Sequence, residues 1–173
     1  MISIVTKQLP KKPSGAVAPP RKKRQFGVKN PGSVVGFCIY GRTGKSVAKD
    51  FTPSKLIKLL QAGLPVKELV ELQAILDVPM EKLAPRLGIS KATLHRRKAQ
   101  GRLGREESDR VLRYARLMGK AVEVFESEED ARRWLTSAQF GLGGAVPLDY
   151  AETEIGAREI EDLLGRIEHG VYS

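Results

Sequence analysis

The feature that most constrains this chain is a series of helix-start signals, each followed by apolar residues at helical spacing, that begins at Thr52 and continues toward the C-terminal end. Thr52 and Pro53 fit the cap and first position of a helix that Gly63 ends, and Pro65 opens the next one. The apolar stripe of this second helix consists of Val66, Leu69, Leu72 and Leu76. Helix signals repeated in this way predict an all-α fold.

Three further helices are predicted beyond residue 104. Residues 105–125 carry one long apolar stripe, Ser127 caps a helix with an acidic first turn, and Thr153 caps the last helix. Between the last two helices, the glycine pair at 143–144 is interpreted as a turn, and Pro147 as the start of a short helical step. Each of these helices has one apolar side that must be buried against another element.

The strongest signal for nucleic-acid binding is a helix-turn-helix spacing. The small residue Ala84 permits close approach of two helices, Gly88 four positions later makes the turn, and Leu94 six positions after that locks the pair. The two helices are predicted at residues 80–87 and 91–98. Together they predict a helix-turn-helix domain, followed in the sequence by a second, small helical domain.

The second helix of this pair is predicted to be the one that contacts DNA. Ser90 caps it and lies, with Lys91, at its N-terminal end, where bases are usually reached. Its outward side chains suit phosphates and base edges. The candidate DNA-binding residues are Ser90, Lys91, Thr93, His95, Arg96, Arg97 and Lys98. The alternative is an exposed basic helix without a ligand, and His95 is interpreted as a polar surface residue rather than a metal ligand.

A stretch that resembles a phosphate-binding loop, Gly-Arg-Thr-Gly-Lys-Ser, occupies residues 41–46. The full motif requires its first glycine at the position of Ile39. The apolar run at 34–40 is compatible with one strand, but no βαβ units follow to build the parallel sheet on which such a site lies. The lysine and serine of the stretch are therefore interpreted as surface residues, and no nucleotide site is predicted.

The net charge of +10 is distributed unevenly along the chain. Residues 1–50 carry +10 and residues 79–120 carry +8, whereas residues 51–78 are balanced and residues 121–173 carry −8. This division indicates a basic part for a polyanion and an acidic part for a different partner. A protein suits the acidic part better than DNA does.

The chain of 173 residues is long enough for one or two small domains. Residues 1–50, which include the run Arg21-Lys22-Lys23-Arg24, are predicted to be a basic, largely flexible tail. Residues 51–120 are predicted to form the helical domain with the helix-turn-helix, and residues 121–173 an acidic C-terminal domain. A single cysteine, Cys38, and the lack of a signal peptide or membrane span favour a soluble, cytoplasmic protein without disulfides, and no metal or cofactor is predicted.

The C-terminal third carries several motifs of a known family. An Ala-x-x-Trp-Leu helix lies at 131–135, a Leu-Gly-Gly-x-x-Pro-Leu-Asp turn at 142–149, and Gly-Val-Tyr at 170–172. Upstream, Thr-Leu-His-Arg-Arg at 93–97 and Glu-Ser-Asp-Arg at 107–110 add to the pattern. These motifs, in this order, resemble the antitoxin family called Xre–MbcA–ParS, over about the last two thirds of the chain.

The resemblance implies an antitoxin of a type II toxin–antitoxin pair, which neutralises a co-encoded toxin and represses its own operon. It implies a toxin commonly of the RES-domain kind, which consumes NAD⁺. It also implies that the C-terminal domain meets this toxin, with the end of the chain near the toxin's active-site entrance. The expected toxin-binding residues are Arg166, Glu168, His169, Gly170, Val171, Tyr172 and Ser173. The alternative for the apolar ones is packing of the final helix, and Ile167 is expected in the core.

Two other function classes are compared with this one. A stand-alone dimeric transcription regulator would use its C-terminal domain only to dimerise, and an enzyme would need a catalytic constellation. Because the sequence has no zinc motif, no Ser-His-Asp set and no placed acid–base pair, no enzymatic activity is predicted. Both leading interpretations imply a homodimer, because helix-turn-helix proteins usually bind two half-sites through a two-fold axis.

Overall fold

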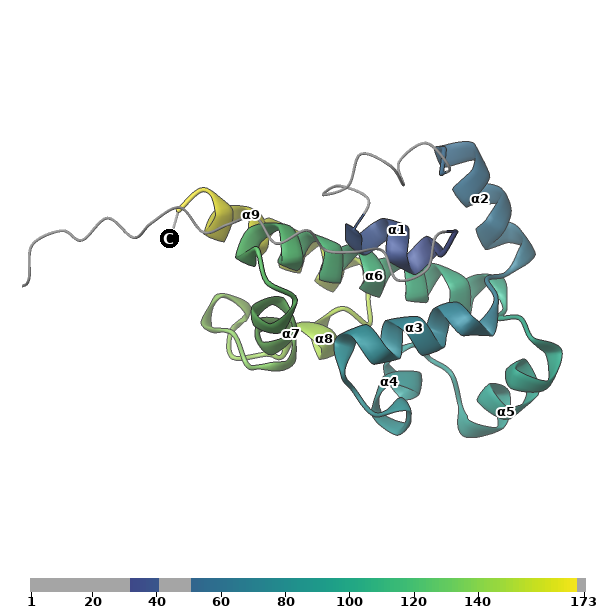
Figure 1. Cartoon of the computed structure of the whole chain (residues 1–173). Helices are drawn as coiled ribbons and strands as arrows, with labels where there is room; N and C mark the ends of the chain where they lie inside the picture. Colours follow the sequence, from purple (N-terminus) through teal and green to yellow (C-terminus); the bar gives the residue numbers. More distant parts are fainter. Residues whose placement is uncertain (1–31, 41–50, 171–173) are drawn as a thin grey trace, which may run out of the picture.

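The structure is a computed structural model that describes residues 32–40 and 51–170 (Figure 1). Within these ranges it is built of helices, with no strand beyond an isolated bridge between Pro65 and Arg102, so the all-α prediction is confirmed. None of the described helices is both long and apolar enough to cross a bilayer. The elements are α1 (Val34–Tyr40), α2 (Pro53–Ala62), α3 (Val66–Leu76), α4 (Met80–Arg86), α5 (Lys91–Gln100), α6 (Arg105–Phe125), α7 (Glu128–Thr136), the 3₁₀ turn η1 (Phe140–Leu142), α8 (Pro147–Tyr150) and α9 (Glu154–Glu168).

Side-chain caps begin four of these helices where the sequence predicts them. The hydroxyl groups of Thr52, Ser90, Ser127 and Thr153 each accept a hydrogen bond from the backbone N–H three residues later. Such a cap satisfies one of the N–H groups that every helix leaves unpaired at its start. The bounds of α6 are those predicted, and α5 continues two residues beyond its predicted end, to Gln100.

The long helix α6 lies at the centre of the fold, and the other helices surround it (Figure 1). It contacts α1, α2, α3, α7 and α9. A wide arc of its surface is apolar and buried, and needs neighbours on both flanks. The buried apolar residues of this arc are Val111, Tyr114, Ala115, Leu117, Met118, Ala121 and Val122.

The segment at 34–40 is a buried helix, not the strand with which its sequence is compatible. A short apolar run fits a buried helix as well as a strand, because it is too short and too uniformly apolar for periodicity to separate the two. The prediction of a flexible tail over residues 1–50 is therefore wrong for α1, which packs against α3 and α6. Residues 1–31 and 41–50 lie outside the described residues. The second of these ranges includes the stretch at 41–46 that resembles a phosphate-binding loop.

Polar contacts fix both ends of α1. The buried carboxylate of Glu68, on α3, accepts hydrogen bonds from the Ser33 hydroxyl and the Val35 backbone N–H, both at 2.9 Å. This places a carboxylate at the start of α1, where the unpaired N–H groups and the helix dipole favour negative charge. At the other end, the Tyr40 hydroxyl donates to Glu128 of α7 at 2.9 Å. The helix α1 thus links α3 to α7.

The backbone of α1 comes into direct contact with α6. A Cβ atom at Gly119 would lie 2.2 Å from the Cys38 carbonyl oxygen, so this close approach requires glycine. Burial raises the pKa of the Cys38 thiol to about 12, against a smaller opposing effect of Arg116. The thiol therefore stays protonated and unreactive at neutral pH.

The burial of α1 leads to a stability prediction. Replacing Ile39, which is 1% exposed, with alanine is expected to lower the free energy of unfolding by about 2–5 kcal/mol, because it leaves a cavity between α1 and α6. The matched variant Ile155→Ala, at a position 76% exposed, is expected to change it by less than about 0.5 kcal/mol. Chemical denaturation measures both, and equal losses would show that α1 is not part of the core.

Candidate functional site

The helices α4 and α5 form the predicted helix-turn-helix. Leu83 and Ala84 of α4 are buried, and the Ile89 backbone N–H donates to the Ala84 carbonyl at 2.8 Å. Gly88 makes the turn with φ of +65°, a conformation that glycine adopts without strain. Leu94 of α5 packs against the core. The predicted roles of the small residue, the turn glycine and the apolar residue are all confirmed.

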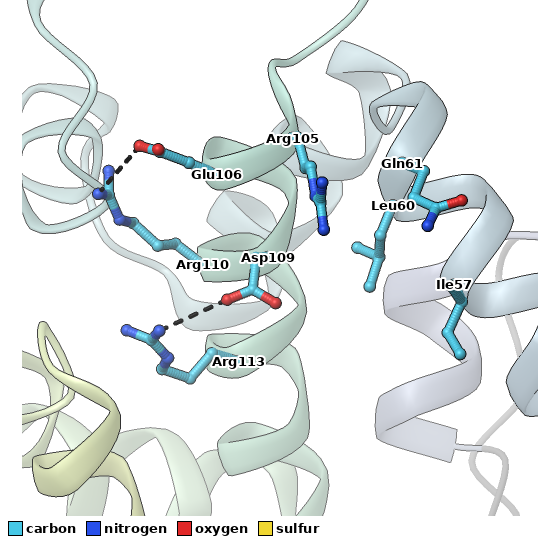
Figure 2. A pocket seen from close by; sticks show the side chains of 8 residues that line it. All are labelled: Ile57, Leu60, Gln61, Arg105, Glu106, Asp109, Arg110 and Arg113. Atoms are coloured by element: carbon cyan, nitrogen blue, oxygen red, sulfur yellow. Dashed lines mark hydrogen bonds and ion pairs between the residues drawn. The ribbon is translucent and has the colours of Figure 1, made fainter.

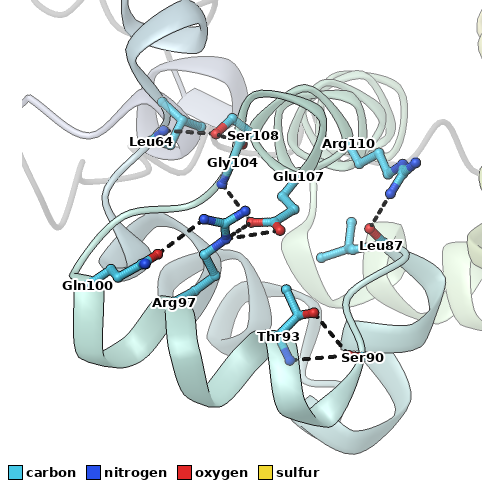
Figure 3. A network of polar contacts seen from close by, with 10 residues as sticks. All are labelled: Leu64, Leu87, Ser90, Thr93, Arg97, Gln100, Gly104, Glu107, Ser108 and Arg110. Atoms are coloured by element: carbon cyan, nitrogen blue, oxygen red, sulfur yellow. Dashed lines mark hydrogen bonds and ion pairs between the residues drawn. The ribbon is translucent and has the colours of Figure 1, made fainter.

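The N-terminal half of α6 holds the helix-turn-helix in place (Figure 3). The guanidinium of Arg110 donates to the Leu87 carbonyl at 3.0 Å, next to the turn. Further along, the Nε–H of Arg97 donates to both carboxylate oxygens of Glu107, at 3.0 and 2.8 Å. Glu107 also accepts the Gly104 backbone N–H at 2.6 Å, at the start of α6. Both α4 and α5 are therefore fixed to the same helix.

Arg97 does not face outward, although the sequence predicts an outward side chain that contacts DNA. Its guanidinium turns back toward α6, pairs with Glu107 and donates to Gln100 at 3.1 Å (Figure 3). Because Glu107 is nearly buried, its charge needs this partner. The sequence contains one signal for the position of Glu107, since a glutamate three residues after an N-cap can accept the backbone N–H of the cap residue, as Glu107 does for Gly104, but it does not show that Arg97 would reach this carboxylate.

The other predicted residues of α5 lie on or near the surface. Ser90, Lys91, His95, Arg96 and Lys98 are exposed, and Thr93 is half-buried beside the capping hydroxyl of Ser90. Within the described part of the chain, no salt bridge involves the three cations, Lys91, Arg96 and Lys98. Their charges face solvent, where an anionic ligand could meet them.

The acidic C-terminal segment is partly neutralised from within the molecule. Beyond residue 140, four of its carboxylates pair with basic residues from the middle of the chain, and three of these pairs join α6 to α9. The pairs are Arg86–Asp149, Arg113–Glu154 at 3.1 Å, Arg116–Glu161 at 3.1 Å and Lys120–Glu168 at 2.6 Å. The opposite charges of the two segments therefore serve their mutual packing as well as any outside partner.

The predicted C-terminal contact residues extend along the last turn of α9 and beyond. Arg166, His169 and Gly170 are exposed, whereas Glu168 forms the ion pair with Lys120. Residues 171–173, which the sequence also assigns to the toxin contact, lie outside the described residues. Ile167 is half-buried, rather than fully in the core as expected.

The turn between α7 and α8 contains a feature that the sequence did not indicate. Its glycines, Gly143 and Gly144, have φ of +64° and +86° and are turn glycines, as predicted. The preceding η1 exposes the side chain of Phe140 completely. Sequence patterns would place an isolated phenylalanine in the core by default, so only the fold reveals its exposure.

A groove of about 480 Å³ lies between α2 and the start of α6 (Figure 2). Its α2 wall is apolar at Ile57 and Leu60. On its α6 wall, the Arg110 guanidinium lies 3.8 Å from the Glu106 carboxylate, and that of Arg113 lies 3.5 Å from Asp109. No histidine, cysteine, serine or lysine lines it, and the described residues contain no cluster of metal-ligating side chains. The carboxylates that line the groove, Glu106 and Asp109, are paired with arginines, and no thiol, hydroxyl, imidazole or lysine amine lies beside them.

Comparison with known proteins identifies the family. Residues 55–116 match the antitoxin Xre-like helix-turn-helix domain, and residues 120–170 match the antitoxin Xre/MbcA/ParS C-terminal toxin-binding domain. The antitoxin Xre of Yersinia enterocolitica is 35% identical over 120 residues, which cover 68% of this chain and 81% of that protein. The chain belongs to the Xre/MbcA/ParS antitoxin family. The resemblance seen in the sequence motifs is confirmed.

Two further relatives of this Xre/MbcA/ParS protein have similar coverage. The antitoxin Xre of Photorhabdus laumondii is 33% identical over 117 residues, 66% of this chain and 79% of that protein. A Sphingobium protein named Prs ADP-ribosylating antitoxin is 26% identical over 132 residues, 70% of this chain and 83% of that protein. This chain is thus a type II antitoxin, not an enzyme, with a helix-turn-helix for DNA and a domain for its toxin.

The two matched domains of this antitoxin share one helix. The first match ends at residue 116 and the second begins at residue 120, and both positions lie within α6 (Arg105–Phe125). The N-terminal helix α1 lies outside both matches, although its side chains are buried against α6. The described residues therefore form one core cluster rather than two separate ones.

The different environments of Arg96 and Arg97 predict different effects of alanine substitution. Arg97→Ala is expected to lower the free energy of unfolding by about 1–3 kcal/mol, because it leaves the Glu107 carboxylate nearly buried without its partner. Arg96→Ala is expected to leave stability unchanged and to weaken operator binding about tenfold or more. Thermal unfolding and gel-shift titration separate the two, and a stable Arg97→Ala protein would argue against the structural role of this pair.

Proposed function

We propose that this antitoxin neutralises a co-encoded RES-type, NAD⁺-consuming toxin by direct binding and represses its own operon through α5. The observation that carries this proposal is the arrangement of the two ends of α6. The helix α5 lies near its first residue, whereas α7 and the end of α9 lie near its last (Figure 1). DNA and a protein partner could therefore approach the same molecule from opposite ends without competing.

The proposed DNA contacts are the residues of α5 that face solvent. Their charge supports phosphate contacts, and the position of Ser90 and Lys91 at the start of the helix supports contacts with bases. The proposed set is Ser90, Lys91, Thr93, His95, Arg96 and Lys98. Arg97 is left out because of its pairing with Glu107.

The proposed toxin contacts lie at the C-terminal end of α9. Arg166, His169 and Gly170 are exposed there. Glu168 is included because its ion pair with Lys120 holds this end of α9 against α6. We include residues 171–173, because they continue the chain beyond the last described turn. The exposed last turn of α9 could enter a cleft of a partner protein.

We further propose a homodimer that acts in the cytoplasm, where both the operator and NAD⁺ are found. Two copies of α5 related by a two-fold axis would fit two half-sites one turn of DNA apart. Repression would then require the dimer, whereas neutralisation would use the C-terminal contact residues of a single protomer.

Operator binding is expected to depend steeply on salt. If Lys91, Arg96 and Lys98 each contact one phosphate, log affinity falls with log salt concentration at a slope of about −2.7 per protomer, or about −5.4 for a dimer. Each of these residues replaced by alanine should reduce the dimer's slope by about 2. Fluorescence anisotropy with the DNA upstream of this gene measures the slope, and a flat response would argue against phosphate contacts by α5.

Expression of the neighbouring reading frame tests the toxin assignment. Alone, it is expected to arrest growth and lower cellular NAD⁺, and coexpression of this antitoxin is expected to restore both. Because the Sphingobium relative's name refers to ADP-ribosylation, which also draws on NAD⁺, ADP-ribosylated proteins should be measured in parallel. NAD⁺ loss without modified protein supports a RES-type toxin, modified protein indicates a transferase, and a harmless neighbour would contradict the proposed partner.

A further inference from the structure

The turn at residues 137–146 is unusual for its composition and its exposure. Charged residues make up 29% of the whole chain, yet none occurs among these ten. At its centre, Phe140 is 101% exposed, more than any other large apolar side chain in the described residues. A charge-free stretch with an aromatic side chain at its tip has the composition of the centre of a protein interface.

The backbone of this turn is held by its own hydrogen bonds. The Gln139 backbone N–H donates to the Ala145 carbonyl at 3.0 Å, and the Gly144 N–H donates back to Gln139 at 2.9 Å. The Gln139 side-chain amide donates to the carbonyls of Trp134 and Ser137, at 2.8 and 3.0 Å. Phe140 is therefore presented on a closed turn, and its binding would require little further ordering of the chain.

The turn is also seated against α9. A Cβ atom at Gly141 would lie 2.7 Å from Leu163 Cδ1, so glycine permits direct contact between the turn and the middle of α9. Leu142 points inward and packs against the core. Phe140, one residue before Gly141, takes no part in this packing and faces solvent. The fold thus fixes the position of Phe140 without using its side chain.

We propose that Phe140 is an anchor by which this antitoxin binds its toxin, as a second point of contact beside the C-terminal end of the chain. This inference rests on the proposed toxin contact and extends it. Arg166 and Ile167 follow Leu163 by three and four residues, so they share its side of α9. The turn and the proposed C-terminal contact therefore both adjoin this side of α9.

The toxin suits this surface better than DNA or a second copy does. Phe140 lies within the matched toxin-binding domain, and its turn lacks the basic residues that phosphates require. The turn lies beyond α7, at the end of the molecule away from α5 (Figure 1). A buried aromatic side chain at the centre of an interface commonly contributes more than its neighbours to binding.

The test is binding of the full-length antitoxin to the toxin encoded beside it. Phe140→Ser is expected to raise the Kd about 30-fold, the change that corresponds to a hot-spot residue, whereas Phe140→Trp is expected to bind nearly as well as the wild type. The melting temperature and operator binding of both variants should be unchanged, because the side chain is solvent-exposed. The matched control is Ile57→Ser, at an exposed apolar position on α2 outside the toxin-binding domain, which should not affect the Kd.

Two further measurements distinguish a contact between Phe140 and the toxin from the contact made by the C-terminal end. A photo-reactive benzoylphenylalanine at position 140 should cross-link to the toxin, and one at position 57 should not. Deletion of residues 166–173 shows whether the C-terminal contact exists independently.

If the deletion weakens binding but Phe140→Ser does not, the anchor proposal fails and the proposed function stands. If the wild type does not bind this toxin, both fail. If Phe140→Ser converts a dimer into a monomer, Phe140 contacts a second copy and the proposal is wrong.

Discussion

Burial of the wide apolar arc of α6 is the constraint on which the other packing in this structure depends. A helix with fully buried side chains along most of its length cannot be covered by one neighbour, and here five other helices contact it. This requirement explains why the two functional parts are not separate bodies. The helix-turn-helix is fixed to the first half of α6 by Glu107 and Arg110, and the C-terminal helices pack on its second half.

The ion pairs also centre on α6. The opposite net charges of the middle and the end of the chain suggest two external partners, but the structure shows that several of these charges meet each other across α6 and α9. Each exposed ion pair contributes little to the free energy of unfolding. The main effect of these pairs is to neutralise charge on α6 and α9. With these side chains paired, Lys91, Arg96 and Lys98 of α5 remain among the cations that form no salt bridge in the described part of the chain.

The sequence predicted what local interactions determine. The caps of four helices, the bounds of α6 and the spacing of Ala84, Gly88 and Leu94 are properties of neighbouring residues, and all are confirmed. It failed where the deciding partner is distant. The helix α1 depends on Glu68, more than thirty residues away, and the orientation of Arg97 depends on Glu107. The exposure of Phe140 depends on how the turn sits against α9, which no pattern in the sequence encodes.

The contact of α1 with Gly119 bears on how this antitoxin can exchange parts with its relatives. Because the border between the matched domains falls inside α6, a hybrid joined there would combine two halves of one helix. The face of α6 that α1 covers, including the glycine at which the two backbones touch, would also have to match the new N-terminal segment. A hybrid that keeps this C-terminal domain is therefore expected to need α1 and α6 as well, because all three pack into one core.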